Sequence, residues 1–220
     1  MKKLTLSYAI AAIVWLLPLI YLLWVYGAMP QTVPMHYGAD GMVDRYGPKT
    51  EFAVTICIVQ GIAVVVYLLL MFLPSIDPKQ KVKYSEGTFQ KTALGIVTFM
   101  AALCIAIIFA TVNRQFKIEQ LLLPLIGLFF AFMGNIMYSI KPNYFAGVRT
   151  PWTLESEDNW RATHQLAGKI WFAGGLAITA LMLVFRGVVA VTIFIVAILL
   201  MAFTPVIYSY IYFRKHRQKQ

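Results

Sequence analysis

Apolar and polar positions follow each other along this chain in long blocks. Six blocks are almost free of charged side chains, and they cover residues 5–26, 52–73, 92–112, 119–139, 167–185 and 188–213. The hydrocarbon core of a bilayer is about 30 Å thick, and a helix needs ~20 apolar residues to cross it. The pattern therefore predicts an all-α polytopic membrane protein, a bundle of six transmembrane helices that forms a single domain over residues 1–220.

Two features of this pattern allow more than one interpretation. The fifth and sixth blocks are separated only by Arg186 and Gly187, which predicts a tight helical hairpin. The first block follows Lys2 and Lys3 and could be a cleaved signal peptide. However, its apolar run of ~22 residues is longer than the 7–15 residues of a signal sequence. We therefore interpret it as a retained first span.

Charge agrees with the membrane assignment and suggests an orientation. Only 13% of the residues are charged, against roughly 25% in soluble domains. If the N-terminus is inside, only a few of the 19 lysines and arginines fall on the outer side: Arg45, Lys49, Arg114, Lys117 and Arg186. The positive-inside rule then predicts cytoplasmic N- and C-termini. Topology and anionic lipids account for the net charge of +10, so no direct nucleic-acid binding is expected.

The middles of the predicted spans hold no acidic residue, lysine, arginine or histidine. All nine acids lie at helix ends or in loops, and only Gln60 and Asn135 are strongly polar and deep. An ion-coupled transporter would be expected to hold a carboxylate there, which makes transport the weaker hypothesis. Cys57 and Cys104 are interpreted as core residues, not as a disulfide or metal pair. The chemistry is therefore expected in two long loops, an outer one at 27–51 and an inner one at 140–166, whose placement after the first helix of each half suggests a 3+3 inverted repeat.

The outer loop contains the signals of a compact, structured cap over the helix ends. Pro34 favours an extended backbone, and Asp40 with Gly41 indicates a turn. His36, Asp40 and Asp44 recur every four residues, but the glycines between them argue against a helix that would align them for a metal. We predict no metal and no cofactor. Hydrogen-bonded loop architecture and a binding surface for a partner outside the cell are both left open.

The inner loop carries the densest polar chemistry of the chain, "GVRTPWTLESEDNW" at residues 147–160. Thr153 is a suitable N-cap with acids in the turns after it, so a helix is expected from about Leu154, unbroken to Phe185. Such a helix of ~32 residues would be about 48 Å long and would project beyond the membrane. Its tryptophans, and Trp152 before it, are expected to act as interfacial anchors: Trp152, Trp160 and Trp171.

The inner loop also holds one of two predicted binding sites, and the outer loop holds the other. Arg149, with two hydroxyls and a rigid proline beside it, could grip a phosphate, a carboxylate or backbone carbonyls. His164 is interpreted either as a satisfied interfacial histidine or as an acid–base group working with Glu157. The predicted inner site comprises Arg149, Thr150, Pro151, Trp152, Thr153, Glu157, Trp160 and His164. The predicted outer site comprises Pro34, His36, Tyr37, Gly41, Asp44 and Lys49.

Both loops resemble segments of a known family. "GVRTPWTLESEDNWRATHQLAGKIW" is similar to the signature block of the SdpI family of bacterial membrane immunity and signal-transduction proteins. "VPMHYGADGMVDRYGPK" resembles the module common at the N-terminus of such proteins. The two segments cover about a fifth of the chain, and its size and six-span layout agree with the family.

The resemblance implies a protein of the bacterial cytoplasmic membrane that protects the cell against a secreted, membrane-active toxin peptide. It also implies a second role in signalling to a cytoplasmic protein partner. The family supplies no agreed catalytic residues, so an enzyme is the less favoured reading and no catalytic residue is assigned. The alternative from the residues alone is a membrane enzyme or a lipid- or small-molecule-handling protein that uses Arg149, Glu157 and His164 at the cytoplasmic interface.

Overall fold

The computed structural model describes all residues except 1, 39–41, 77–85, 114–115 and 218–220. Within the described residues, six helices are long and apolar enough to cross a membrane. They are α1 (Lys2–Tyr26), α2 (Lys49–Ile76), α3 (Glu86–Val112), α4 (Glu119–Met137), α6 (Glu157–Val184) and α7 (Gly187–Arg217). The chain is therefore a polytopic, helical membrane protein, as the apolar blocks predicted.

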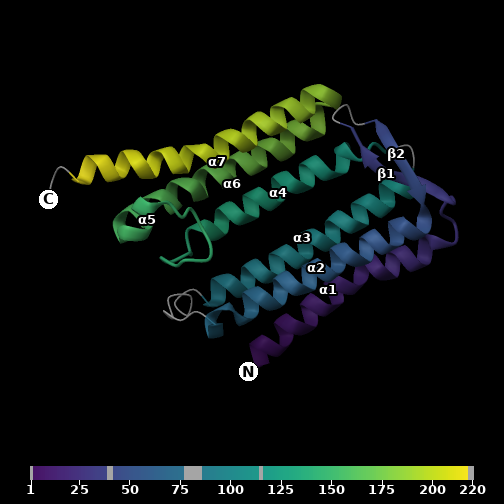
Figure 1. Cartoon of the computed structure of the whole chain (residues 1–220), viewed down its shortest axis with the longest axis horizontal. Coiled ribbons are helices and arrows are strands. Elements are labelled where there is room, and N and C mark those ends of the chain that lie inside the picture. Colours follow the sequence, from purple (N-terminus) through teal and green to yellow (C-terminus); the bar gives the residue numbers. More distant parts are fainter. Residues whose placement is uncertain (1, 39–41, 77–85, 114–115, 218–220) are drawn as a thin grey trace.

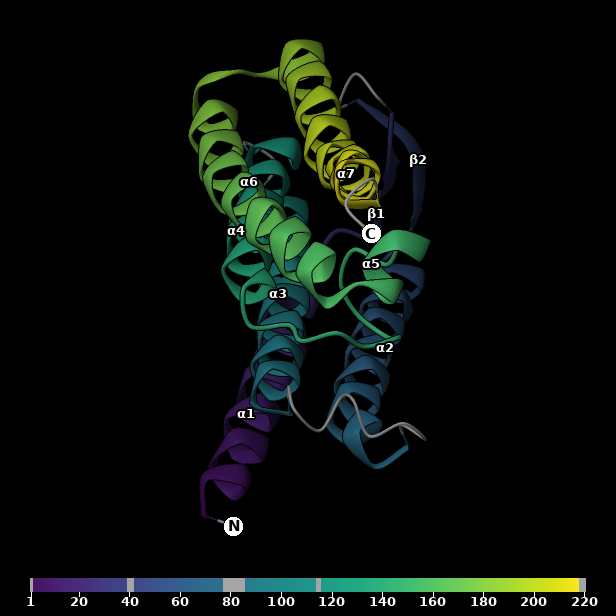
Figure 2. The ribbon, with the colours of Figure 1, turned by 90° about the vertical axis from the view of Figure 1, so that its left-hand side faces the viewer.

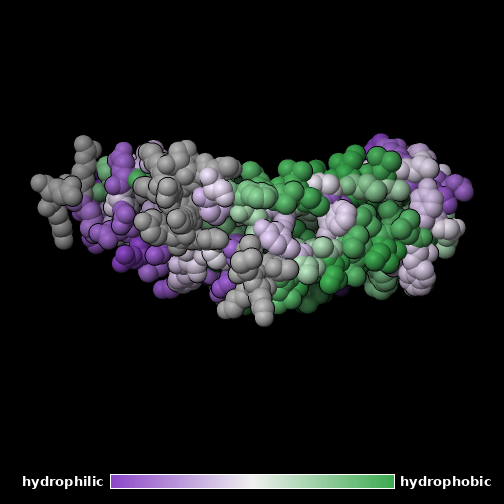
Figure 3. All heavy atoms as spheres, turned by 90° about the horizontal axis from the view of Figure 1, so that it is seen from below, coloured by the Kyte–Doolittle hydropathy of each residue, from purple (hydrophilic) through white to green (hydrophobic). Residues whose placement is uncertain are grey.

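The helices run along one common direction, and successive long helices point in opposite directions. α1 and α7 lie at opposite edges of the bundle, and α3 and α4 lie between them (Figures 1 and 2). Hydrophobic side chains occupy the middle of the face shown in Figure 3, and hydrophilic ones gather at its two ends. This distribution is what a bilayer requires of a spanning protein. The 3+3 inverted repeat stays a prediction.

The outer loop folds into a hairpin of two antiparallel strands, β1 (Thr32–Tyr37) and β2 (Val43–Pro48). Val33 of β1 is completely buried against Met29, Phe52 and Ile56 at the ends of α1 and α2. The loop is thus structured and caps the helix ends, as predicted. The cap adds a small sheet to a protein whose elements were all expected to be helical.

Helices α4 and α6 pack closely against each other. A Cβ atom at Gly134 would lie 2.3 Å from the backbone nitrogen of Phe172, and one at Gly175 would lie 2.4 Å from that of Ala131. Glycine at these two positions lets the backbones approach, which is how membrane helices gain packing energy without a hydrophobic driving force. This seam fixes α6 against α4 and so positions the inner signature block.

The inner block starts with a short separate helix, α5 (Pro151–Glu155), which corrects the predicted single helix from Leu154 to Phe185. Thr150, not Thr153, is the N-cap of α5, and Pro151 occupies the first helical position, where its missing N–H costs nothing. The backbone is extended at Ser156, whose side chain caps α6 by accepting from the N–H of Asn159. The chain therefore turns between α5 and α6.

Candidate functional site

The two signature segments lie at opposite ends of the molecule. The hairpin β1–β2 packs at one end, and α5 with the start of α6 lies at the other, the end that also holds both chain termini (Figure 1). Three long helices separate the two segments in sequence, so each segment reaches a different end. This agrees with the predicted arrangement of one loop on each side of the membrane.

Two threonines of the inner block form a buried capping unit at the start of α5. The Thr150 N–H donates to the Thr153 hydroxyl at 2.9 Å, and the Thr153 N–H donates to the Thr150 hydroxyl at 3.2 Å. The Thr153 hydroxyl also lies 2.8 Å from the carbonyl oxygen of Val148. These bonds satisfy backbone groups that a helix start leaves unpaired. The two hydroxyls are therefore occupied by the fold itself.

His164 fastens the segment before α5 to α6. Its Nε2 atom accepts from the Val148 N–H at 3.0 Å, and its Nδ1 atom lies 2.8 Å from the Trp160 carbonyl oxygen. The imidazole is stacked on the Trp160 ring at a centroid distance of 4.0 Å. With Nδ1 donating and Nε2 accepting, both nitrogens of a neutral ring are satisfied. This agrees with the interpretation of His164 as a satisfied interfacial histidine.

Gly147 makes the contact with His164 possible. Its φ angle is +106°, and a Cβ atom there would lie 2.2 Å from His164 Nε2. Glycine is the residue that adopts such a conformation at little steric cost. The positive φ angle and the close contact with His164 therefore explain why the signature block begins with glycine.

A second set of buried polar contacts joins the inner block to α7. The Asn159 side-chain amide donates to the Ser209 carbonyl oxygen at 3.0 Å, and the Thr163 hydroxyl donates to Asn159 Oδ1 at 3.0 Å. The hydroxyls of Thr150 and Ser209 are 3.2 Å apart. Nearby, the Trp152 ring lies against Tyr210 at 5.0 Å. The block is thus joined to the last helix by buried hydrogen bonds.

Arg149 and Trp160 have positions that differ from the simplest expectation. The Arg149 side chain is exposed, and its Nη1 donates to the Tyr144 carbonyl oxygen at 2.6 Å, one of the three groups that it was predicted to grip. Trp160 is only 2% exposed, and its indole N–H donates to the Ile140 carbonyl oxygen at 2.9 Å. Trp160 is therefore a core residue of the inner end, which corrects its assignment as an interfacial anchor.

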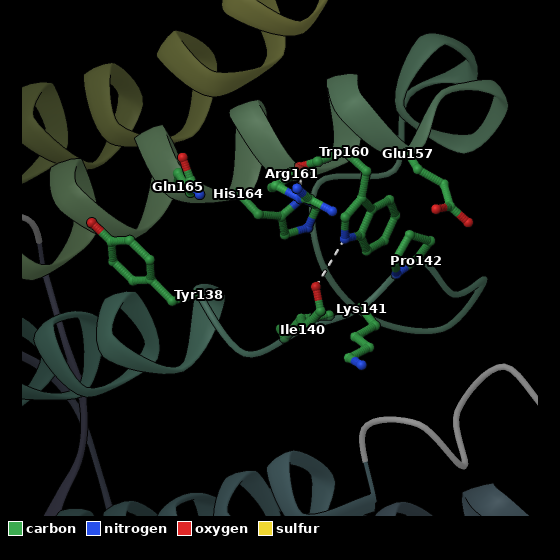
Figure 4. A pocket seen from close by; sticks show the side chains of 9 residues that line it. All are labelled: Tyr138, Ile140, Lys141, Pro142, Glu157, Trp160, Arg161, His164 and Gln165. Atoms are coloured by element: carbon green, nitrogen blue, oxygen red, sulfur yellow. Dashed lines mark hydrogen bonds between the residues drawn. The ribbon is translucent and has the colours of Figure 1, made fainter.

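A cavity of about 500 Å³ opens between α6 and the segment that follows α4 (Figure 4). It is lined by Tyr138, Ile140, Lys141, Pro142, Glu157, Trp160, Arg161, His164 and Gln165. The cavity brings together three of the predicted inner-site residues, Glu157, Trp160 and His164. The run from Arg149 to Thr153 does not line it.

The outer site is more exposed than the inner one. His36 Nδ1 lies 2.7 Å from Asp44 Oδ1 across the hairpin, and both side chains are more than half exposed. Lys49 donates to the Tyr26 carbonyl oxygen at 3.1 Å and so caps the end of α1. Pro34 lies in β1 with an intermediate exposure. Gly41 lies outside the described residues.

Tyr37 lies where the hairpin meets the start of α4. Burial raises the pKa of Tyr37 above its usual range, and the charges of Tyr46 and Glu119 raise that pKa further. Glu119 is the first residue of α4 and is buried, and among the described residues neither of its carboxylate oxygens has a hydrogen-bond partner. A carboxylate in the first turn is favoured by the helix dipole. The outer site therefore extends from the hairpin to the second half of the bundle.

Sequence reasoning missed several residues of these two sites. Asn143 is buried, and its side-chain oxygen accepts from the N–H groups of Phe145 and Ala146, which shapes the turn after α4. Asparagine before a turn is a local signal that could have found it. Ser209 gave no such signal, because a single serine in an apolar span is common. Its role depends on tertiary packing alone.

The fold and these two ends define a six-helix membrane protein with a structured cap at one end and a hydrogen-bonded polar block at the other. Comparison with known proteins agrees with this class. Residues 139–209 match the model of the SdpI/YfhL protein family, and residues 13–61 match a domain of unknown function, DUF1648. The chain is 24% identical over 218 residues to the immunity protein SdpI of Bacillus subtilis (strain 168), and the match covers 98% of each chain. No solved structure matches. The predicted resemblance to the SdpI family is confirmed.

Proposed function

We propose that this chain is an SdpI-like immunity protein that protects a bacterium from a secreted, membrane-active toxin peptide. The observation that carries the proposal is the similarity to an immunity protein along 98% of both chains. That similarity includes both polar ends and not only the apolar spans, whose composition many membrane proteins share. The layout, with one polar segment at each end of the bundle, suits a protein that meets a peptide on one side and responds on the other.

The outer hairpin is the proposed contact for the peptide. His36, Asp44 and Arg45 are exposed there, and the hairpin rests on the buried Val33 at the ends of α1 and α2. A peptide that pressed on this cap would act directly on the helices. The inner block, through α5 and the polar contacts to α7, would carry that change to a cytoplasmic protein partner.

The alternative of a membrane enzyme receives less support from the geometry. Acid–base catalysis needs a ring nitrogen of His164 that can exchange a proton with a substrate. Val148 and Trp160 occupy both nitrogens. Arg149 is turned to the Tyr144 carbonyl oxygen and does not line the cavity that contains Glu157 and His164. A catalytic group made of Arg149, Glu157 and His164 is therefore not assembled.

The proposal is tested by expressing the chain in a sensitive bacterial host and measuring survival against purified amphipathic peptides that permeabilise bacterial membranes. We expect cells that express the chain to survive a peptide concentration that kills cells with an empty vector. The control is an unrelated six-span membrane protein expressed to the same level. Identical killing curves for the chain and this control across the peptides, with the chain detected in the membrane fraction, would contradict the immunity function.

A further inference from the structure

The cavity in Figure 4 exists because α4 and α6 differ in length. α4 has 19 residues and α6 has 28, which correspond to about 28 Å and 42 Å at 1.5 Å per residue. A Cβ atom at Gly168 would lie 2.6 Å from the Tyr138 ring, so Gly168 is level with the end of α4. The residues of α6 before Gly168 therefore extend beyond α4, and the chain after α4 turns away and leaves a hollow.

The same helix lengths give the depth of this cavity relative to the hydrocarbon core of the membrane. α4 is about as long as the hydrocarbon core is thick, roughly 30 Å, so its end marks the edge of that core. His164 lies four residues beyond the level of Gly168, or about 6 Å, and Arg161 lies about 10 Å beyond it. The polar headgroups occupy roughly the first 5–8 Å outside the core on each side. The side of the cavity at His164 is therefore at the depth of lipid headgroups, and Arg161 lies just outside that depth.

The chemistry of the cavity suits a phosphate group. Arg161 comes from α6 and Lys141 from the segment after α4, so two cations from different elements line one hollow. Guanidinium and ammonium groups are the usual protein donors to phosphate oxygens. The ring of Trp160 is held by its bond to Ile140 and by stacking on His164, which provides a rigid wall.

Glu157 narrows the class of ligand. It lines the cavity beside Pro142, so Lys141 and Arg161 contribute two positive charges and Glu157 one negative charge. The remaining single positive charge matches a phosphodiester better than a doubly charged phosphate. A carboxylate also accepts hydrogen bonds from hydroxyl groups. We propose that this cavity binds the headgroup of an anionic phospholipid with one phosphodiester and free hydroxyls, at the membrane face that carries the inner signature block.

The proposal does not depend on the immunity function and can be tested on the purified full chain. Native mass spectrometry would count phosphatidylglycerol molecules retained by the protein from mixed micelles with phosphatidylcholine. We expect the double variant Lys141→Gln/Arg161→Gln to lose about tenfold or more in affinity for phosphatidylglycerol, because it removes both positive charges that line the cavity. The matched control is Lys169→Gln/Arg214→Gln, which removes one lysine and one arginine that do not line the cavity. It should bind as the unmodified chain does.

Two further measurements test the role of Glu157 and the assignment of the ligand to a lipid. Glu157→Gln should shift the preference toward the more highly charged phosphatidic acid, and an unchanged preference would contradict the role of this carboxylate. Equal retention by the double variant and the control would overturn the site. Occupancy by soluble glycerol phosphate in phosphatidylcholine micelles, with the same dependence on Lys141 and Arg161, would overturn the assignment to a lipid.

Discussion

The outer hairpin and the inner block are both rich in polar residues, but they use them in different ways. At the outer end, His36 pairs with Asp44 and Arg45 with Glu51, and all four side chains are exposed. At the inner end, polar side chains such as that of Thr153 are buried and form hydrogen bonds with backbone atoms. Exposed pairs contribute little to stability, whereas an unpaired buried group costs about 1–3 kcal/mol.

This difference separates residues that maintain the fold from residues that are available to a partner. The buried residues of the inner signature block hold α5 and α6 to the rest of the bundle, so the identity of these buried residues is explained without a ligand. The exposed outer residues have no comparable structural reason. Substitutions at the inner end are therefore expected to affect stability first, and substitutions at the outer end to affect protection first.

The largest effect is expected for Gly147→Ala at the inner end. The new Cβ atom would meet His164 Nε2 at 2.2 Å, and alanine would be strained at a φ of +106°. Strain and the lost bond from the Val148 N–H together predict a loss of about 3 kcal/mol or more in the free energy of unfolding. Titration with a denaturing detergent, followed by circular dichroism, measures this loss.

Gly187→Ala is the matched control for this prediction. Gly187 also has a positive φ, of +58°, but its Cβ atom would meet nothing within 4 Å. Only the backbone term remains, roughly 1–2 kcal/mol. If the two substitutions destabilised the protein equally, the contact between Gly147 and His164 would have no special weight in the fold.

A smaller effect is expected for Thr153→Val. Valine keeps the shape but removes the hydroxyl that accepts from the buried Thr150 N–H and lies 2.8 Å from the Val148 carbonyl oxygen. Leaving these groups unpaired costs about 2 kcal/mol in the free energy of unfolding. Thr98→Val serves as the control, because the exposed Thr98 hydroxyl donates only along its own helix to Leu94. A control variant that was destabilised as much as Thr153→Val would refute the proposed role of the buried unit.

Much of the fold could be predicted from the sequence because lipid imposes a simple rule. Each span must be long and apolar whatever it packs against, so the six helices follow from local composition. The placement of the two loops at opposite ends follows from the three spans between them. The family resemblance was also visible in sequence, because both segments keep short runs of specific residues.

Tertiary contacts account for what was missed. Thr150 and Thr153 are equally good capping residues, and only Pro151 at the first helical position distinguishes them. Tryptophan is a typical interfacial anchor, but Trp160 is buried because the turn after α4 folds over it. The sequence predicted an extended backbone at Pro34 but not the pairing of two strands. Pro34 fits into β1 because both strands of a two-stranded sheet are edge strands.

The smallest change in stability is expected at the outer hairpin, for His36→Ala. The side chain is exposed and its partner Asp44 is exposed too, so the free energy of unfolding should change by less than about 0.5 kcal/mol. Protection against a peptide that contacts the hairpin should nevertheless fall, and survival curves at matched protein abundance measure it.

Arg45→Gln breaks the neighbouring exposed pair with Glu51 and is the control. A loss of protection confined to His36→Ala would place the contact at the His36–Asp44 pair, and equal losses would extend it over the hairpin. Full protection in both variants, with the fold intact, would remove the hairpin as the peptide contact and leave its polar residues without a binding role.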